Sequence, residues 1–243
     1  MSTYTRKGFT PANETSSINW KIVVRFGVVA LLMPLIPFVA AGRLDWWQMW
    51  LYTLLTIPLS IASRYILLRK NPDLFVERSR FTQGAGIKSW DKVIVMFIAI
   101  VGPLIVMVIA GLDKRYAWSS EVALWLEIAA GAVILLGYLF SLWAMMVNPF
   151  FSSVVRIQAD RGQTAISAGP YRFVRHPGYI GGIVAWAVTP IMFGTLWAFI
   201  PVMLVLALYV LRTALEDRTL QAELPGYTEY TQRTHYRLLP GIW

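Results

Sequence analysis

The chain has 243 residues, of which 57% are apolar and only 14% are charged, and its mean hydropathy is +0.55. A soluble domain has roughly 25% charged residues, so the composition excludes an ordinary soluble fold and indicates an all-α integral membrane protein. The net charge of +9 does not indicate nucleic-acid binding, because the basic residues lie between long apolar runs, and with no cysteine and two histidines a metal centre is not expected.

A membrane-spanning helix needs about 20 mostly apolar residues, and the sequence predicts six such helices in one membrane domain. The first four are expected at 22–41, 46–68, 93–112 and 122–147. The last apolar stretch, 180–215, is too long for one crossing and is interrupted at Thr189-Pro190 and again at Phe193-Gly194-Thr195. We therefore expect two short helices joined in a tight hairpin, because Pro removes a backbone donor and Gly permits a turn.

The first apolar stretch has a second interpretation, a cleaved signal peptide flanked by Lys21 and Arg25. The stretch is longer than the apolar core of a usual signal peptide, and it contains Pro34 and Pro37. A membrane-spanning helix is therefore the favoured prediction.

Lysine and arginine placement predicts the orientation of the chain. With a cytoplasmic N-terminus, the outside loops hold only Arg43, Lys114 and Arg115 of the 22 basic residues. This asymmetry predicts that both termini are cytoplasmic. Tryptophans near the predicted span ends fit an aromatic belt at the membrane boundaries, namely Trp46, Trp47, Trp50, Trp90, Trp118 and Trp125.

Polar segments divide the rest of the chain. Residues 1–19 are expected to form a mobile tail, 20–144 to carry the first four helices, and 145–243 to carry the chemistry. The basic segment 69–92 is expected at the membrane surface, where Arg78 and Asp91 face phospholipid or, alternatively, help to close an active site.

Two clusters in the last third have residues suited to ligand binding. The first, Gly169-Pro-Tyr-Arg-Phe-Val-Arg-His-Pro-Gly-Tyr-Ile-Gly181, places cations, aromatics and glycines directly before a predicted helix. The second is Arg212 with Glu216, four residues apart on one helix face and followed by Asp217. A carboxylate can bind ribose hydroxyls and an arginine can bind a substrate carboxylate, whereas a salt bridge between Arg212 and Glu216 is the structural alternative.

The first cluster resembles the signature Gly-Pro-Tyr-x-x-Val-Arg-His-Pro-x-Tyr-x-Gly of the isoprenylcysteine carboxyl methyltransferase and phospholipid methyltransferase families. The tail is similar as well, with Pro-Gly-x-x-x-Tyr at 225–230, Arg-x-x-Pro at 237–240 and a predicted cytoplasmic C-terminal helix. The resemblance covers about residues 145–243. Asp217 departs from the usual Glu, and Pro225 stands where an aromatic residue is common.

The resemblance implies a methyltransferase that uses S-adenosylmethionine on a lipophilic acceptor from the bilayer, most readily the carboxylate of an isoprenylcysteine-like or isoprenoid substrate. It implies that Arg212, Glu216 and Arg237 act in catalysis, with Arg212 on the substrate carboxylate. The cofactor-binding residues that it implies are Gln158, Gln163, Thr164, Ala165, Ile166, Tyr171, Arg175, His176, Pro177, Gly178, Tyr179 and Glu216.

Several alternatives stay open on the sequence alone. The acceptor could also be a phospholipid amine or a small N- or S-nucleophile, because the sequence does not decide between a carboxylate, an amine and a thiol. Sterol-type membrane reductases that use NADPH share the Arg-His…Tyr loop, but Pro177 after the histidine favours a methyltransferase. A non-catalytic membrane scaffold that retains a nucleotide-like pocket is the third class.

Overall fold

The computed structural model describes residues 33–79, 81–83 and 85–243. The predicted mobile tail, 1–19, and most of the first predicted span, 22–41, lie outside the described residues; of that span only the short helix α2, Leu35–Ala41, is described. The described residues form helices and no β-strand, as the all-α prediction requires. The longer elements are α3 (Trp47–Lys70), α4 (Pro72–Ser79), α5 (Ser89–Met96), α6 (Gly102–Tyr116), α7 (Leu124–Val147), α8 (Pro177–Phe193), α9 (Phe199–Glu223) and α10 (Tyr227–Arg233).

Four helical segments among the described residues are long and apolar enough to cross a membrane. They are 47–70, 89–116, 124–147 and 196–223, and α8 is a fifth, shorter apolar helix. The segment 89–116 is continuous because a π-helical stretch, Phe97–Val101, joins α5 to α6. The spans predicted at 46–68, 93–112 and 122–147 are therefore present with shifted ends.

The hairpin of the last two spans differs in detail from the prediction. The predicted interruption at Thr189-Pro190 is wrong, because α8 continues through both residues and Pro190 lies in its last turn, near the helix end. The chain turns at Gly194, whose φ of 63° is left-handed. After a short 3₁₀ turn, Leu196–Ala198, helix α9 runs for 25 residues, so the second helix of the hairpin is not short.

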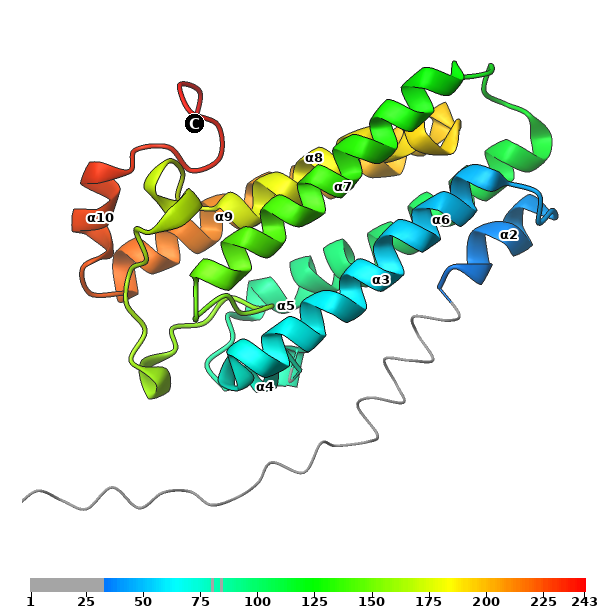
Figure 1. The fold of residues 1–243 in the computed structure, drawn as a ribbon. Coiled ribbons are helices and arrows are strands. Elements are labelled where there is room, and N and C mark those ends of the chain that lie inside the picture. The colour runs from blue at the N-terminus through cyan, green and yellow to red at the C-terminus, as the bar shows by residue number, and fades with distance from the viewer. Residues whose placement is uncertain (1–32, 80, 84) are drawn as a thin grey trace, which may run out of the picture.

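Helices α7, α8 and α9 lie side by side in one layer, and α3, α5 and α6 lie beneath them (Figure 1). Helices α7 and α8 approach each other closely, since a Cβ atom on Gly181 would lie 2.2 Å from the carbonyl oxygen of Gly137. Small residues allow helices to pack closely in a membrane, where apolar burial alone does not hold them together.

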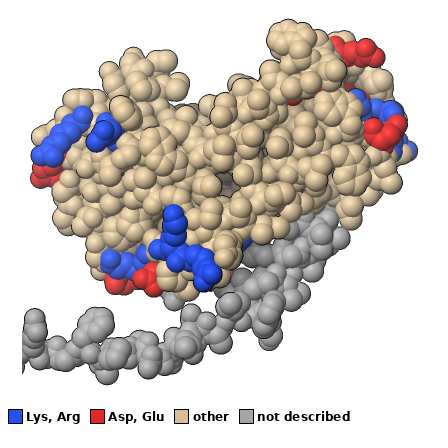
Figure 2. Space-filling model, in the orientation of Figure 1, with Lys and Arg blue, Asp and Glu red and all other residues tan. Residues whose placement is uncertain are grey.

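On the face that Figure 2 shows, charged side chains gather at the two ends of the bundle and the middle is uncharged. We call the end formed by Val147, Pro177 and Glu223 the site end. The opposite end carries Arg43 and Arg115, which lies against Gly42. An uncharged band between charged ends is what a membrane-spanning bundle requires.

The predicted aromatic belt needs one correction. Trp46 is 1% exposed, and its indole N–H donates to the Phe193 carbonyl over 3.2 Å, so it belongs to the core. Trp47, Trp50 and Trp125 are exposed, as belt residues should be.

Candidate functional site

Asp217 is the centre of a large hydrogen-bond cluster at the site end. Its carboxylate is fully buried and binds both Arg175 and Arg237, with Nε–Oδ distances of 2.8 Å to each arginine. The Tyr227 hydroxyl donates to it over 3.1 Å, and the His176 Nε2 atom lies 3.4 Å away. A buried carboxylate needs such partners to offset the loss of water.

These contacts hold three parts of the chain together. Arg175 and His176 come from the loop before α8, Asp217 from α9, and Arg237 from the C-terminal tail. The backbone N–H groups of Arg175 and His176 also donate to the carbonyls of Tyr236 and Arg237, over 2.9 and 3.0 Å. The loop and the tail therefore meet at the site end of the bundle.

Glu216 points to a different side of α9 from Asp217, because neighbouring residues on a helix are about 100° apart. Its carboxylate accepts a hydrogen bond from the Tyr179 hydroxyl at the start of α8. It also lies close to Tyr171: burial first, and then the Glu216 charge, raise the pKa of Tyr171. Tyr171 therefore stays a neutral phenol at physiological pH.

Arg212 has a partner that local spacing does not predict. Its Nε and Nη2 atoms donate to Asp91 of α5 over 2.7 and 3.1 Å, and its guanidinium lies over the Tyr179 ring at 5.3 Å. The ion pair of Arg212 is thus with Asp91 and not with Glu216. Asp91 is fully buried, so the favoured expectation that it faces phospholipid is wrong.

The two glutamines that lead into the loop shape the loop itself. Gln158 is 1% exposed; its side-chain N–H donates to the Phe150 carbonyl over 2.8 Å, and its oxygen accepts from Arg161. The Gln163 side-chain oxygen accepts from the Gln158 backbone N–H over 2.7 Å. Both side chains are therefore occupied within the chain.

The three residues after Gln163 have backbone N–H groups without a hydrogen-bond partner in the described part of the chain. No N–H group of Thr164, Ala165 or Ile166 donates to another group in the described part of the chain. Ala165 packs against the buried cluster of Leu224, Tyr227 and Tyr230, which holds this segment beside the end of α9. An extended segment with free amides can bind the polar edge of a ligand.

The start of α8 is packed tightly enough to require glycine. A Cβ atom on Gly178 would lie 2.4 Å from the Phe151 ring, and the Gly178 carbonyl accepts from Ser141 over 3.0 Å. Pro177 takes the first helical position, where no N–H is needed. The His176 and Tyr179 rings stack with their centroids 5.8 Å apart.

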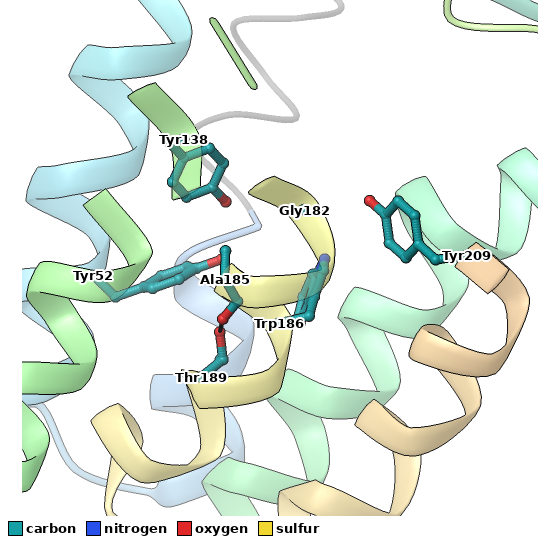
Figure 3. A pocket seen from close by; sticks show the side chains of 7 residues that line it. All are labelled: Tyr52, Tyr138, Gly182, Ala185, Trp186, Thr189 and Tyr209. Atoms are coloured by element: carbon teal, nitrogen blue, oxygen red, sulfur yellow. Dashed lines mark hydrogen bonds between the residues drawn. The ribbon is translucent and has the colours of Figure 1, made fainter. Parts of the chain in front are cut away.

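A cavity of about 120 Å³ lies deeper in the bundle, between α3, α7, α8 and α9. Figure 3 shows the hydroxyls of Tyr138 and Tyr209 pointing toward the space beside Gly182. Tyr209 connects this cavity to the site end, because its ring packs edge-to-face against that of Tyr179, with the two ring centroids 5.9 Å apart. The remaining lining residues are Tyr52, Ala185, Trp186 and Thr189.

The structure thus places most of the predicted residues together and adds Asp91 and Asp217 as their ion-pair partners. Tyr171, Arg175, His176, Tyr179, Arg212, Glu216 and Arg237 meet at the site end. The sequence did not predict that Asp91 and Asp217 would be the partners of these arginines, and only the requirement that buried arginines be paired could have suggested a carboxylate. No group of three or more potential metal ligands occurs among the described residues.

Comparison with known proteins gives one family. Residues 129–222 match the model of the isoprenylcysteine carboxyl methyltransferase (ICMT) family. The matched residues begin in α7 and end within α9, so they include the loop and Arg212 to Asp217 but not α10 or the tail. No curated protein matches the chain. The family match and the apolar helices support a membrane methyltransferase.

Proposed function

We propose that this protein transfers a methyl group from S-adenosylmethionine to the carboxylate of a lipophilic acceptor, such as an isoprenylcysteine-like or isoprenoid acid. The observation that carries the proposal is the position of Glu216. In the described part of the chain its carboxylate has one hydrogen-bond partner, Tyr179, and it lies near Tyr171 at the site end. Its neighbour Asp217 is instead fully used in holding the loop and the tail.

The side chains and backbone at the site end suit an adenosine-containing cofactor. Glu216 can accept hydrogen bonds from ribose hydroxyls or from an amino group. The open amides of Thr164 to Ile166 can meet the polar edge of a purine, and Tyr171 and His176 offer flat apolar faces. These contacts need neither a metal ion nor a cysteine.

The acceptor is proposed to reach the site from the bilayer. The cavity beside Gly182 and Tyr209 lies among the membrane helices and connects to Tyr179 through ring contacts, so it can hold the apolar part of an acceptor. The Arg212 guanidinium also lies over the Tyr179 ring. Its Nη1 atom makes no hydrogen bond in the described part of the chain. Arg212 can therefore donate to an acceptor carboxylate without leaving Asp91.

The protein's contribution to the reaction is alignment and exclusion of water. When bound, S-adenosylmethionine supplies the methyl group for an in-line displacement. A carboxylate acceptor is already ionised at neutral pH, so no side chain has to remove a proton from it. The ion pair of Arg212 with Asp91 and the hydrogen bond of Tyr179 with Glu216 hold the side chains between cofactor and acceptor in place.

Calorimetric binding to the detergent-purified protein tests this proposal. S-adenosylmethionine and its demethylated product should bind, and NADPH should not. Glu216→Gln should weaken the binding of S-adenosylmethionine and of its demethylated product by about tenfold or more. Hydrogen bonds to a charged group contribute roughly 1.5–3 kcal/mol. Glu223→Gln is the matched control, since this exposed acid on the same helix pairs with Lys88.

Unchanged affinity in Glu216→Gln would remove Glu216 from the cofactor site. Binding of NADPH alone would replace the proposal with a membrane reductase. Methyl transfer is then measured with a farnesylated N-acetylcysteine and with amine and thiol lipids of similar length. Transfer to the amine or thiol alone would keep the methyltransferase and reject the carboxylate acceptor.

A further inference from the structure

Among the described residues, Arg78 on α4 is an arginine without a carboxylate partner. It is half-buried, and its Nη1 atom donates to the Phe151 carbonyl over 3.0 Å while its guanidinium lies over the Phe151 ring at 5.4 Å. In the part of the chain that the structure describes, no Asp or Glu lies within ion-pair distance of it. Arginine has five N–H donors, and one of them makes a hydrogen bond to the described part of the chain.

Four other arginines of the site end have a carboxylate partner, whereas half-buried Arg161, like Arg78, has none among the described residues. Arg212 is neutralised by Asp91, Arg175 and Arg237 share Asp217, and Arg156 pairs with Glu77. A half-buried cation without a counter-ion is unfavourable unless something supplies the missing charge. Burial first, and then the charges of Arg64 and Arg212, lower the pKa of Arg78 to about 10, so it stays protonated at neutral pH.

The position of Arg78 relates it to the proposed acceptor site. Its Nη1 atom donates to the carbonyl of Phe151, and Arg212 Nη2 donates to the carbonyl of Ser153, two residues further along the same segment. The Phe151 ring beneath its guanidinium touches Gly178, at the start of α8. Arg78 and Arg212 thus hold the same short segment, and Arg78 lies next to the start of α8, where the loop ends.

We propose that Arg78 binds the carboxylate of the acceptor and supplies the positive charge that Arg212 has already given to Asp91. This inference rests on the proposed function and adds a substrate-binding residue from α4, outside the segment that matches the family. Arg78 and the free Nη1 atom of Arg212 bind the carboxylate together, and this selects acids over neutral acceptors of equal length.

An acid is favoured over a phospholipid phosphate because of where Arg78 lies. Its half-buried guanidinium lies over the Phe151 ring, which is packed against Gly178 at the start of α8. A lipid headgroup would be met first by the exposed arginines at the membrane surface, such as Arg69.

The test compares a carboxylate inhibitor with its uncharged carboxamide, which has nearly the same shape. Both are non-reacting farnesyl thioethers, and their inhibition constants are measured with the full-length protein in zwitterionic nanodiscs. The wild-type protein should prefer the acid, and Arg78→Gln should lower the acid-to-amide preference by about 10- to 100-fold. Arg78→Lys should restore part of it.

Arg69→Gln is the matched control. Arg69 also stacks on an aromatic ring, with its guanidinium 5.6 Å from the Tyr65 centroid, but it is exposed on α3. Its removal takes away the same charge and should leave the preference unchanged. Cofactor binding by every variant, measured by calorimetry, reports whether the fold is retained.

An equal loss of affinity for acid and amide in Arg78→Gln would mean a packing role and would overturn the inference. So would an unchanged preference combined with an altered response to anionic phospholipid, which would assign Arg78 to a headgroup. Absence of methyl transfer to any carboxylate by the wild-type protein would be a failure of the proposed function instead.

Discussion

Two neighbouring acids on α9 have different tasks because of the helical rotation between them. Asp217 faces the loop and the tail and binds two arginines, a tyrosine and the side-chain amide of Gln221. Glu216 faces Tyr179 and keeps most of its hydrogen-bonding capacity. One helix end therefore provides both the support of the site and a candidate ligand contact.

Asp217→Asn should destabilise the protein by about 3 kcal/mol or more, because it leaves the buried Arg175 and the half-buried Arg237 without their counter-ion. The tail that Arg237 anchors should become more sensitive to proteases. Urea unfolding in detergent and limited proteolysis measure the two effects. Glu229→Gln removes an exposed acid from α10 and should change neither; wild-type behaviour of Asp217→Asn would show that the cluster is not structurally important.

Among the elements, the turn between α8 and α9 places Tyr179 and Glu216 opposite each other at the far ends of two adjacent helices. Gly194 makes this turn with φ 63°, and a Cβ atom there would lie 2.6 Å from Glu127 Oε1. Gly226, which precedes α10, has φ 78°, but a Cβ atom there would have no neighbouring atom within 4 Å. The two glycines share the backbone requirement and differ in the space around them.

Gly194→Ala should therefore destabilise the protein more than Gly226→Ala. Both substitutions carry the cost of a left-handed alanine, about 1 kcal/mol, and only the first also displaces Glu127 from Gln48, to which it is bound over 2.9 Å. The difference in free energy of unfolding between the two variants measures the contact alone. Equal destabilisation would show that Glu127 moves aside freely.

Helix α4, which carries Arg78, is also held to the loop after α7 by an ion pair. Arg156 Nε and Nη2 each donate to Glu77 over 2.8 Å. The hydrogen bonds from Arg156 lower the pKa of Glu77 below its ordinary value of 4.5. This pair is a direct link between the basic segment 69–92 and the loop that leads into the site.

The Glu77 pair should make stability depend on pH in a defined direction. A carboxylate with a lowered folded-state pKa contributes stability that is present above its unfolded value and is lost as the pH falls through the folded value. The stability gap between the wild-type protein and Glu77→Gln should thus be constant near pH 7 and narrow below pH 4.5. Thermal unfolding at pH 7 and below pH 4.5 measures this gap, with Asp73→Asn of the same helix as control. A gap that widens in acid would contradict the lowered pKa of Glu77.

At the scale of the whole molecule, charge separates the two ends of the bundle. Arg43, Lys114 and Arg115 belong to the end opposite the site, and the arginines of the candidate site lie at the other. By the positive-inside rule the site end should face the cytoplasm, where S-adenosylmethionine is made available to it. The orientation also sets which leaflet delivers the acceptor.

Reporter fusions test this orientation. A reporter at either terminus should give a cytoplasmic signal, because six crossings return the chain to the side on which it began. A reporter inserted after Ala117, between α6 and α7, should give the opposite signal and serves as the internal control. An N-terminal reporter on the outside would reduce the number of crossings to five.

The sequence by itself determined where the spans 47–70, 89–116 and 124–147 lie and which loop resembles a methyltransferase signature, because hydropathy, length and motif spacing are local properties. It did not determine that Pro190 stays inside α8, since a proline near a helix end is tolerated and only the position of Gly194 decides the turn. Nor did it identify the counter-ions. Arg212 and Asp91 are 121 residues apart, and Arg175 and Asp217 are 42 apart. Buried charges must be paired, but packing alone decides which carboxylate reaches which arginine, and so it is the tertiary structure that leaves Arg78 without one among the described residues.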